Sequence, residues 1–162
     1  MKKIRLHFID YEFEENDPDF DCLKQLVEME EKGELAEIDV AVISSMFELH
    51  KELPSLPKAL FNNGFTLPEN KKSLGDRDSI WKYEKDGEDT RILKYKQKMW
   101  DTMWMRSDHY HIDIEYKVGD LVALYEYRDC EDDYGRSKKR YKYCCIKKND
   151  KIILEHKKDF LK

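Results

Sequence analysis

Residues 116–127 read Tyr116-Lys117-Val118-Gly119-Asp120-Leu121-Val122-Ala123-Leu124-Tyr125-Glu126-Tyr127, and this stretch decides the fold of the chain. Gly119 can adopt backbone conformations that are closed to other residues, and Asp120 stabilises turns. Both come directly before an alternating apolar run, which is the pattern of a strand. The stretch is therefore typical of a chain that bends sharply into one strand of a small β-barrel.

The residues on either side of this stretch extend the β pattern. We expect strands over residues 109–116, 120–128, 139–147 and 151–156, the last two joined at Asn149-Asp150. Upstream, Asp86-Gly87 predicts a two-residue hairpin that places Trp81 opposite Ile92.

The first third of the chain has helical signals instead. Residues 4–8 alternate as a half-buried strand, and Asp17-Pro18 supplies an N-cap and a first-turn proline for a helix that ends at Gly33. A second helix is expected over residues 34–53, and the proline- and glycine-containing segment 54–78 is the expected linker. The fold class is thus α+β: an N-terminal strand and two helices (domain 1–75), followed by a mostly antiparallel small β-barrel (domain 76–162).

Composition limits the class of protein. The chain has 162 residues, of which 40% are hydrophobic and 40% charged, and a net charge of −5. No apolar run approaches the roughly 18 residues that a membrane span needs. The four cysteines lack the Cys-x-x-Cys spacing of zinc sites, so reduced thiols are expected. We expect a soluble, cytoplasmic protein.

Charge is distributed unevenly along the chain. Residues 1–53 hold 6 Lys/Arg against 15 Asp/Glu, whereas residues 134–162 hold 11 against 3. A basic C-terminal end is typical of contact with a polyanion. Two solvated faces that attract each other within the molecule would explain the same asymmetry.

Basic and aromatic residues alternate in the last strands, and this predicts a nucleic-acid site. Lysine and arginine neutralise phosphates, and exposed tyrosines stack on unpaired bases, so RNA or single strands are the expected ligand. An ordinary sheet rich in tyrosine and edge lysine is the structural alternative. The candidate residues are Arg106, Tyr125, Tyr127, Arg136, Lys139, Arg140, Tyr141, Lys142 and Tyr143.

A second constellation could hold a metal. His109, His111, Asp113 and Glu115 alternate along one strand and so share a face. Imidazole and carboxylate suit zinc, manganese or iron. However, side chains at i and i+2 on one face of a strand are about 7 Å apart, so a further ligand must come from elsewhere. We interpret the row as a solvated polar face and expect no metal or other cofactor; His109 and His111 are the candidate ligands.

Met103–Asp108, Tyr116–Tyr127 and Tyr134-Gly135-Arg136 together resemble the ASCH family of PUA-like domains, over roughly residues 91–158. The resemblance implies a PUA-like barrel, for which an SH3-like barrel is the alternative, and recognition of RNA or modified nucleosides. The family's catalytic signature resembles Gly-x-Lys-x-x-Glu-x-Arg. Here Arg106 matches, while Asp101 and Trp104 replace the lysine and the glutamate, so we expect no catalysis by the family route.

The acidic front of the chain suggests a different function. Spaced carboxylates, with Glu28, Glu30 and Glu31 as the candidates, could occupy a basic groove. This predicts a small phage-type inhibitor or adaptor protein that blocks a nucleic-acid-processing defence enzyme. An enzyme ranks third.

Overall fold

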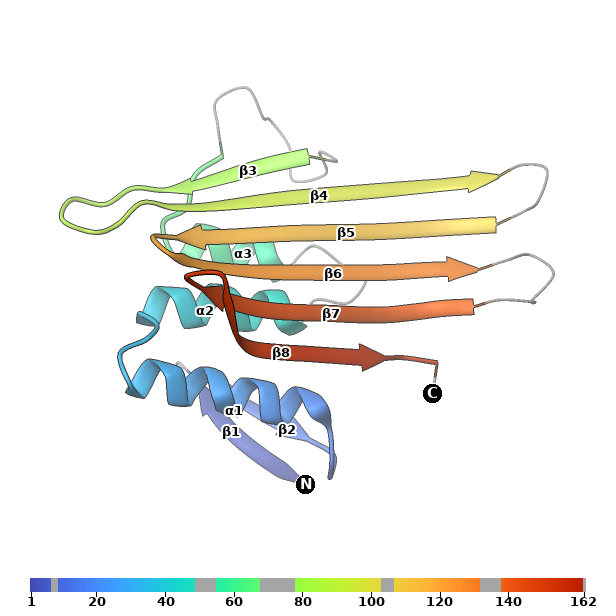
Figure 1. Cartoon of the computed structure of the whole chain (residues 1–162), viewed down its shortest axis with the longest axis horizontal. Helices are drawn as coiled ribbons and strands as arrows, with labels where there is room; N and C mark the ends of the chain where they lie inside the picture. Colours follow the sequence, from blue (N-terminus) through green and yellow to red (C-terminus); the bar gives the residue numbers. More distant parts are fainter. Residues whose placement is uncertain (7–8, 49–54, 68–77, 103–106, 132–137, 162) are drawn as a thin grey trace. The chain divides into compact units, whose positions relative to one another are not determined.

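The computed structural model describes residues 1–6, 9–48, 55–67, 78–102, 107–131 and 138–161. Within these residues the protein is α+β, with three helices, a two-stranded sheet and a six-stranded antiparallel sheet (Figure 1). The chain divides into two compact units, Met1–Ala59 and Leu60–Lys162. The domain boundary predicted between residues 75 and 76 lies outside the described residues.

The elements follow one another in a simple order. The first unit contains β1 (Lys2–Leu6), β2 (Ile9–Phe13), α1 (Pro18–Glu31) and α2 (Glu37–Glu48), and α3 (Ser55–Asn62) crosses into the second. The large sheet consists of β3 (Asp78–Tyr83), β4 (Arg91–Thr102), β5 (Ser107–Val118), β6 (Leu121–Glu131), β7 (Lys138–Lys148) and β8 (Lys151–Asp159).

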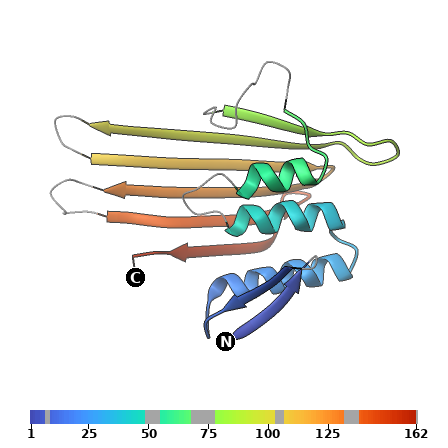
Figure 2. The ribbon, with the colours of Figure 1, turned by 180° about the vertical axis from the view of Figure 1, so that it is seen from behind.

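In the first unit, α1 packs against β1 and α2, and Figure 2 shows β1 and β2 beside it. The N-terminal strand was predicted, but its antiparallel partner β2 was not. Positions 7 and 8, assigned to the first strand by the sequence pattern, lie outside the described residues. The N-cap prediction is confirmed, because the Asp17 carboxylate accepts a hydrogen bond of 2.9 Å from the Asp19 N–H and Pro18 opens the helix.

The end of α1 explains why α2 begins later than predicted. Gly33 has φ +75°, its N–H donates to the Glu30 carbonyl, and the Glu34 N–H donates to the Met29 carbonyl. These bonds form a Schellman cap that uses residues 33 and 34 to satisfy the last carbonyls of α1. α2 therefore starts at Glu37 rather than Glu34, with the Asp39 carboxylate accepting from the Ala36 N–H. The predicted end of this helix falls in the undescribed residues 49–54.

Part of the predicted linker is the helix α3. Its proline, Pro57, lies in the first turn, where no intrahelical N–H bond is lost. The helix ends at a second glycine cap: Gly64 has φ +88°, and the Phe65 N–H donates to the Leu60 carbonyl. Asn62, Asn63 and Gly64, which lie in the expected linker, thus form the end of this helix.

The large sheet is a meander in which each strand pairs with its neighbours in sequence, in the order β3-β4-β5-β6-β7-β8. The four C-terminal strands are those predicted, with ends that differ from the predicted ones by up to three residues. Asn149 and Asp150 both have positive φ, 51° and 64°, which is the backbone of a type I′ turn between β7 and β8. Gly119, with φ +56°, forms the predicted bend between β5 and β6. The Asn149 N–H donates to the Asp120 carbonyl and links the two turns.

The predicted register of the first hairpin is wrong by one residue. Tyr83 pairs with Arg91 and Trp81 with Leu93, so residues 84–90 form the connection rather than two residues. Directly opposite residues share a face, and this register puts Trp81 and Leu93 on the same buried face. The wider loop is closed by the Tyr83 hydroxyl, which donates to the Glu88 carboxylate at 2.5 Å.

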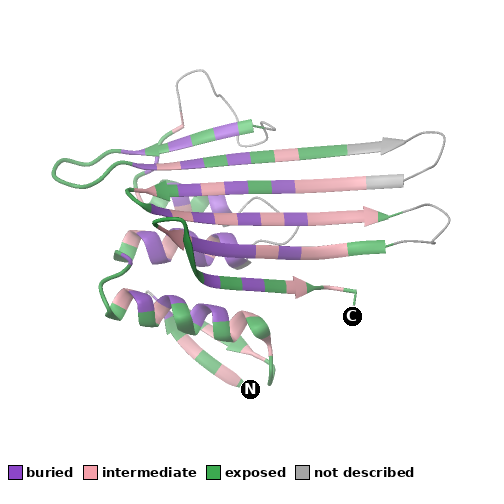
Figure 3. Cartoon of the chain, viewed as in Figure 1, coloured by how far each residue is buried: buried purple, intermediate pink, exposed green. Residues whose placement is uncertain are grey.

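Among the described residues, β3 and β8 are not paired with each other, and no closed barrel is found. Burial alternates along β3 and β6, and Figure 3 shows it for β6, where every second residue from Leu121 to Tyr127 is buried. β7 departs from this pattern, because Cys144, Cys145 and Ile146 are all buried. The core of the second unit is therefore built mainly on one face of the sheet.

Candidate functional site

The large sheet has two chemically different faces, which the strand register defines. We call one the buried face; it carries Leu93, Tyr95, Ile112, Ile114, Tyr116, Ala123, Tyr125, Tyr127, Lys142, Cys144, Ile146 and Leu154. We call the other the polar face; it carries Lys94, Lys96, Lys98, His109, His111, Asp113, Glu115, Leu124, Glu126, Arg128, Cys130, Lys139, Tyr141, Tyr143, Cys145 and Lys157.

Three predicted nucleic-acid-binding residues lie on the buried face, which corrects the expectation that they are exposed. Tyr125 is 2% exposed, and Tyr127 and Lys142 are both 0% exposed. The Tyr127 ring packs edge-on against Tyr110, with the centroids 6.0 Å apart. These two tyrosines cannot stack on bases, because their rings are core.

The other described candidates keep some exposure. Lys139 is exposed, and Tyr141 and Tyr143 are half-buried on the polar face. The Lys157 ammonium lies 5.2 Å from the centre of the Tyr141 ring, a cation–π contact on that face. Partial burial raises the pKa of Tyr143 to about 12, so its hydroxyl stays protonated at neutral pH.

Arg140 is half-buried on the side of the sheet opposite Tyr141. Its Nε donates to the Tyr127 hydroxyl at 3.2 Å, and its guanidinium lies 5.1 Å from the Phe160 ring centre. The bond to Tyr127 is the main cause that raises the pKa of Arg140. Arg106 and Arg136 lie outside the described residues.

Three lysines of the polar face were not among the candidates predicted from the sequence. Lys94, Lys96 and Lys98 are exposed and alternate along β4. Their spacing of two was the signal that could have found them, because it places all three on one face of a strand. In register they face Glu115, Asp113 and His111 of β5, respectively.

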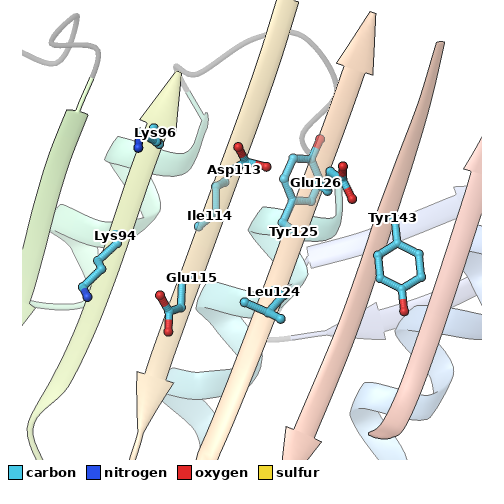
Figure 4. Close-up of a pocket in the computed structure, with 9 residues that line it drawn as sticks. All are labelled: Lys94, Lys96, Asp113, Ile114, Glu115, Leu124, Tyr125, Glu126 and Tyr143. Carbon is cyan, nitrogen blue, oxygen red and sulfur yellow. The ribbon is translucent and has the colours of Figure 1, made fainter. Parts of the chain in front are cut away.

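The polar face contains a pocket of about 400 Å³, shown in Figure 4. Leu124 contributes apolar surface and Tyr143 a ring, and Lys94 and Lys96 supply cations on β4. Its other lining residues are Asp113, Ile114, Glu115, Tyr125 and Glu126. Two of the acids are held by one cation: Arg128 Nη2 lies 2.9 Å from Asp113 and 3.1 Å from Glu126. The pocket thus combines an apolar surface, two tyrosines, two lysines and three carboxylates.

The histidine row predicted for β5 has the expected geometry, since His109, His111, Asp113 and Glu115 all lie on the polar face. The residues that come close enough to hold a metal ion, however, are not the four of the predicted row. His109 and His111 approach Cys130 of β6, with ligand atoms all within 4.8 Å of one another. Asp113 instead pairs with Arg128. Cys130 was missed because it is 19 residues from His111 and becomes a neighbour only through β5–β6 pairing.

The electrostatics of this cluster favour uncharged groups. The pKa of His111 is lowered mainly by burial and to a smaller extent by the nearby Arg128 guanidinium. The pKa of the Cys130 thiol is raised mainly by burial and to a smaller extent by the Asp129 carboxylate.

The acidic candidates lie on α1 in the first unit. Glu28 and Glu31 are exposed, and Glu30 is half-buried. All three fall in the last turn of the helix, which carries no basic residue. Some acids of this unit are already paired, such as Glu12 with Lys3 at 3.3 Å.

Comparison of the chain with family models, curated proteins and solved structures finds no match. None of the described helices has the length and apolar character needed to cross a membrane.

Proposed function

We propose that the polar face of the large sheet binds single-stranded nucleic acid, with RNA preferred. The observation that carries this proposal is the arrangement of half-buried Tyr141 and Tyr143 beside lysines from β4, β7 and β8 on one face. An antiparallel sheet with rings on its solvent side can stack bases, and flanking cations can contact the phosphates.

The pocket gives the proposal its local chemistry. A base can lie on the apolar surface of Leu124 against the Tyr143 ring, while Lys94 and Lys96 contact the backbone. Stacking on an aromatic side chain contributes about 1–3 kcal/mol per base. Because both Asp113 and Glu126 pair with Arg128, which offsets one of their two negative charges, these two carboxylates repel phosphates less than two unpaired acids would.

The residues proposed here to bind nucleic acid differ from those predicted from the sequence. Lys139, Tyr141 and Tyr143 stay in it, and Tyr125, Tyr127 and Lys142 leave it because they are buried. A non-catalytic role, the ASCH resemblance and a closed PUA-like or SH3-like barrel all remain predictions.

The test is binding of fluorescent oligonucleotides, measured by anisotropy in low salt, with single-stranded RNA, single-stranded DNA and duplexes compared. We expect Tyr143→Ala to weaken RNA binding by about 1–3 kcal/mol. Lys94→Glu with Lys96→Glu should weaken it further and reduce the salt dependence, because fewer counterions are released.

A matched control makes the same change in charge elsewhere. Lys24→Glu with Lys58→Glu alters two exposed helical lysines of the first unit and should leave affinity nearly unchanged. Equal losses from the two double variants would mean that net charge, not the polar face, drives binding. Undetectable binding of every oligonucleotide at low salt would reject the proposal.

A second candidate function has one specific observation in its favour. A helix C-terminus carries partial negative charge, so the carboxylates of Glu28, Glu30 and Glu31 in the last turn of α1 destabilise the helix. A locally unfavourable acidic cluster is consistent with selection for contact with a basic protein surface. Such a partner would be captured from lysate in a nuclease-resistant complex and lost with Glu28→Lys and Glu31→Lys. Capture that disappears after nuclease treatment would count against this candidate.

A further inference from the structure

We propose that His109, His111 and Cys130 form a binding site for a zinc-type transition-metal dication on the polar face. The site joins two adjacent strands: His109 lies directly opposite Cys130 in the β5–β6 register, and His111 is two residues further along β5. The proposal goes beyond nucleic-acid binding and does not depend on it.

The distances fit a small tetrahedral ion. With bonds of about 2.1 Å to nitrogen and about 2.3 Å to sulfur, neighbouring ligand atoms around zinc are roughly 3.5 Å apart. Cys130 Sγ and His111 Nε2 are 3.5 Å apart, so one edge of the tetrahedron is already formed. The third ligand atom, from His109, lies within 4.8 Å of the other two. The two imidazole rings are edge-on, with centroids 6.3 Å apart.

The donor set selects the class of metal. Two imidazole nitrogens and a thiolate sulfur suit zinc and its neighbours in the transition series, whereas magnesium and calcium require oxygen ligands. The nearest carboxylate along the strand, Asp113, is bound to Arg128 and is not needed. Three protein ligands leave the fourth position for water or for a nitrogen or oxygen donor of a bound molecule.

Cys130 differs from the other cysteines in exposure. Cys22, Cys144 and Cys145 are buried, and Cys130 is half-buried. A metal can therefore reach this thiol from solvent. The cations facing the site are Lys98 and Arg128, both opposite His111, and Lys139, opposite Cys130. Arg128 is neutralised by two carboxylates, which reduces its repulsion of a dication.

The first test is spectroscopic titration of the chelator-treated full chain with Co²⁺, followed by displacement with Zn²⁺. We expect one ion per chain, a thiolate-to-cobalt charge-transfer band, and the intense visible bands of four-coordinate cobalt. Cys130→Ser should abolish the charge-transfer band. His111→Ala should weaken affinity by about 100-fold or more, since even residues that only orient ligands contribute roughly 10–100-fold.

Asp113→Asn is the matched control, because it changes another candidate donor of the same face and should keep both the stoichiometry and the band. A second measurement needs no variant: Zn²⁺ should slow the alkylation of Cys130 in the unaltered protein, read by mass spectrometry of its peptides. The proposal is overturned if cobalt gives no thiolate band, if Cys130→Ser binds as the unaltered chain does, or if Zn²⁺ leaves the alkylation rate of Cys130 unchanged.

Discussion

At the residue scale, Tyr127 shows how a side chain that resembles a ligand-binding residue serves the core. Its ring contacts Tyr110 and Phe160, with centroids 6.0 Å and 6.3 Å away, and its hydroxyl accepts from Arg140 at 3.2 Å. Removing only the hydroxyl leaves the packing and loses one hydrogen bond, whereas removing the ring leaves a cavity.

We therefore expect Tyr127→Phe to lower the free energy of unfolding by about 0.5–1.5 kcal/mol and Tyr127→Ala to lower it by about 3–5 kcal/mol. Chemical denaturation monitored by tryptophan fluorescence measures both. Tyr127→Phe should leave oligonucleotide affinity unchanged, in contrast to Tyr143→Ala. A loss of affinity with Tyr127→Phe, at unchanged fold, would contradict the assignment of Tyr127 to the core.

At the element scale, the last turn of α1 is the least favourable part of its helix. Asp19 and Asp21 in the first turn complement the helix dipole, and Glu28 and Glu31 in the last turn oppose it.

Glu28→Gln with Glu31→Gln should raise the free energy of unfolding by about 0.3–1 kcal/mol per site at low ionic strength. Thermal unfolding measures the gain, which should shrink as salt is added. Asp19→Asn with Asp21→Asn is the control with the same charge change, and it should have the opposite sign. A fall in stability with the glutamine pair would contradict the dipole argument.

At the scale of the whole molecule, burial of tyrosines makes the free energy of unfolding depend on pH in the alkaline range. Burial raises the pKa of Tyr95 and of Tyr125 far above the ordinary value of about 10. The folded state holds both phenols protonated while the unfolded chain releases their protons above pH 10. Their stabilisation is therefore complete below about pH 10 and is lost as pH rises beyond it.

Each such tyrosine contributes about 1.4 kcal/mol per pH unit to the fall in stability above pH 10. Tyr125→Phe should make that fall shallower by this amount, measured as the free energy of unfolding across about pH 9 to 12. An unchanged slope would show that Tyr125 titrates in the folded state as it does in the unfolded chain.

Much of the fold could be predicted because its signals are local. The cap at Asp17-Pro18, the stop at Gly33, the bend at Gly119 and the turn at Asn149-Asp150 each depend on one or two residues whose backbone preferences determine the outcome. Signals shared by two structures were misinterpreted. Pro57 and Gly64 fit a linker as well as they fit the two ends of α3.

The sequence by itself determined the four C-terminal strands of the large sheet, and it determined which residues of each strand share a face, because side chains alternate with period two. Only the tertiary structure decided which face is buried. Tyr125 pairs with Cys144, so Tyr141 and Tyr143 fall on the side opposite Tyr125 and Tyr127. The same register brings Cys130 to His109 and His111. The physical reason is that pairing between strands is a contact between distant residues, and a shift of one residue would exchange the two faces.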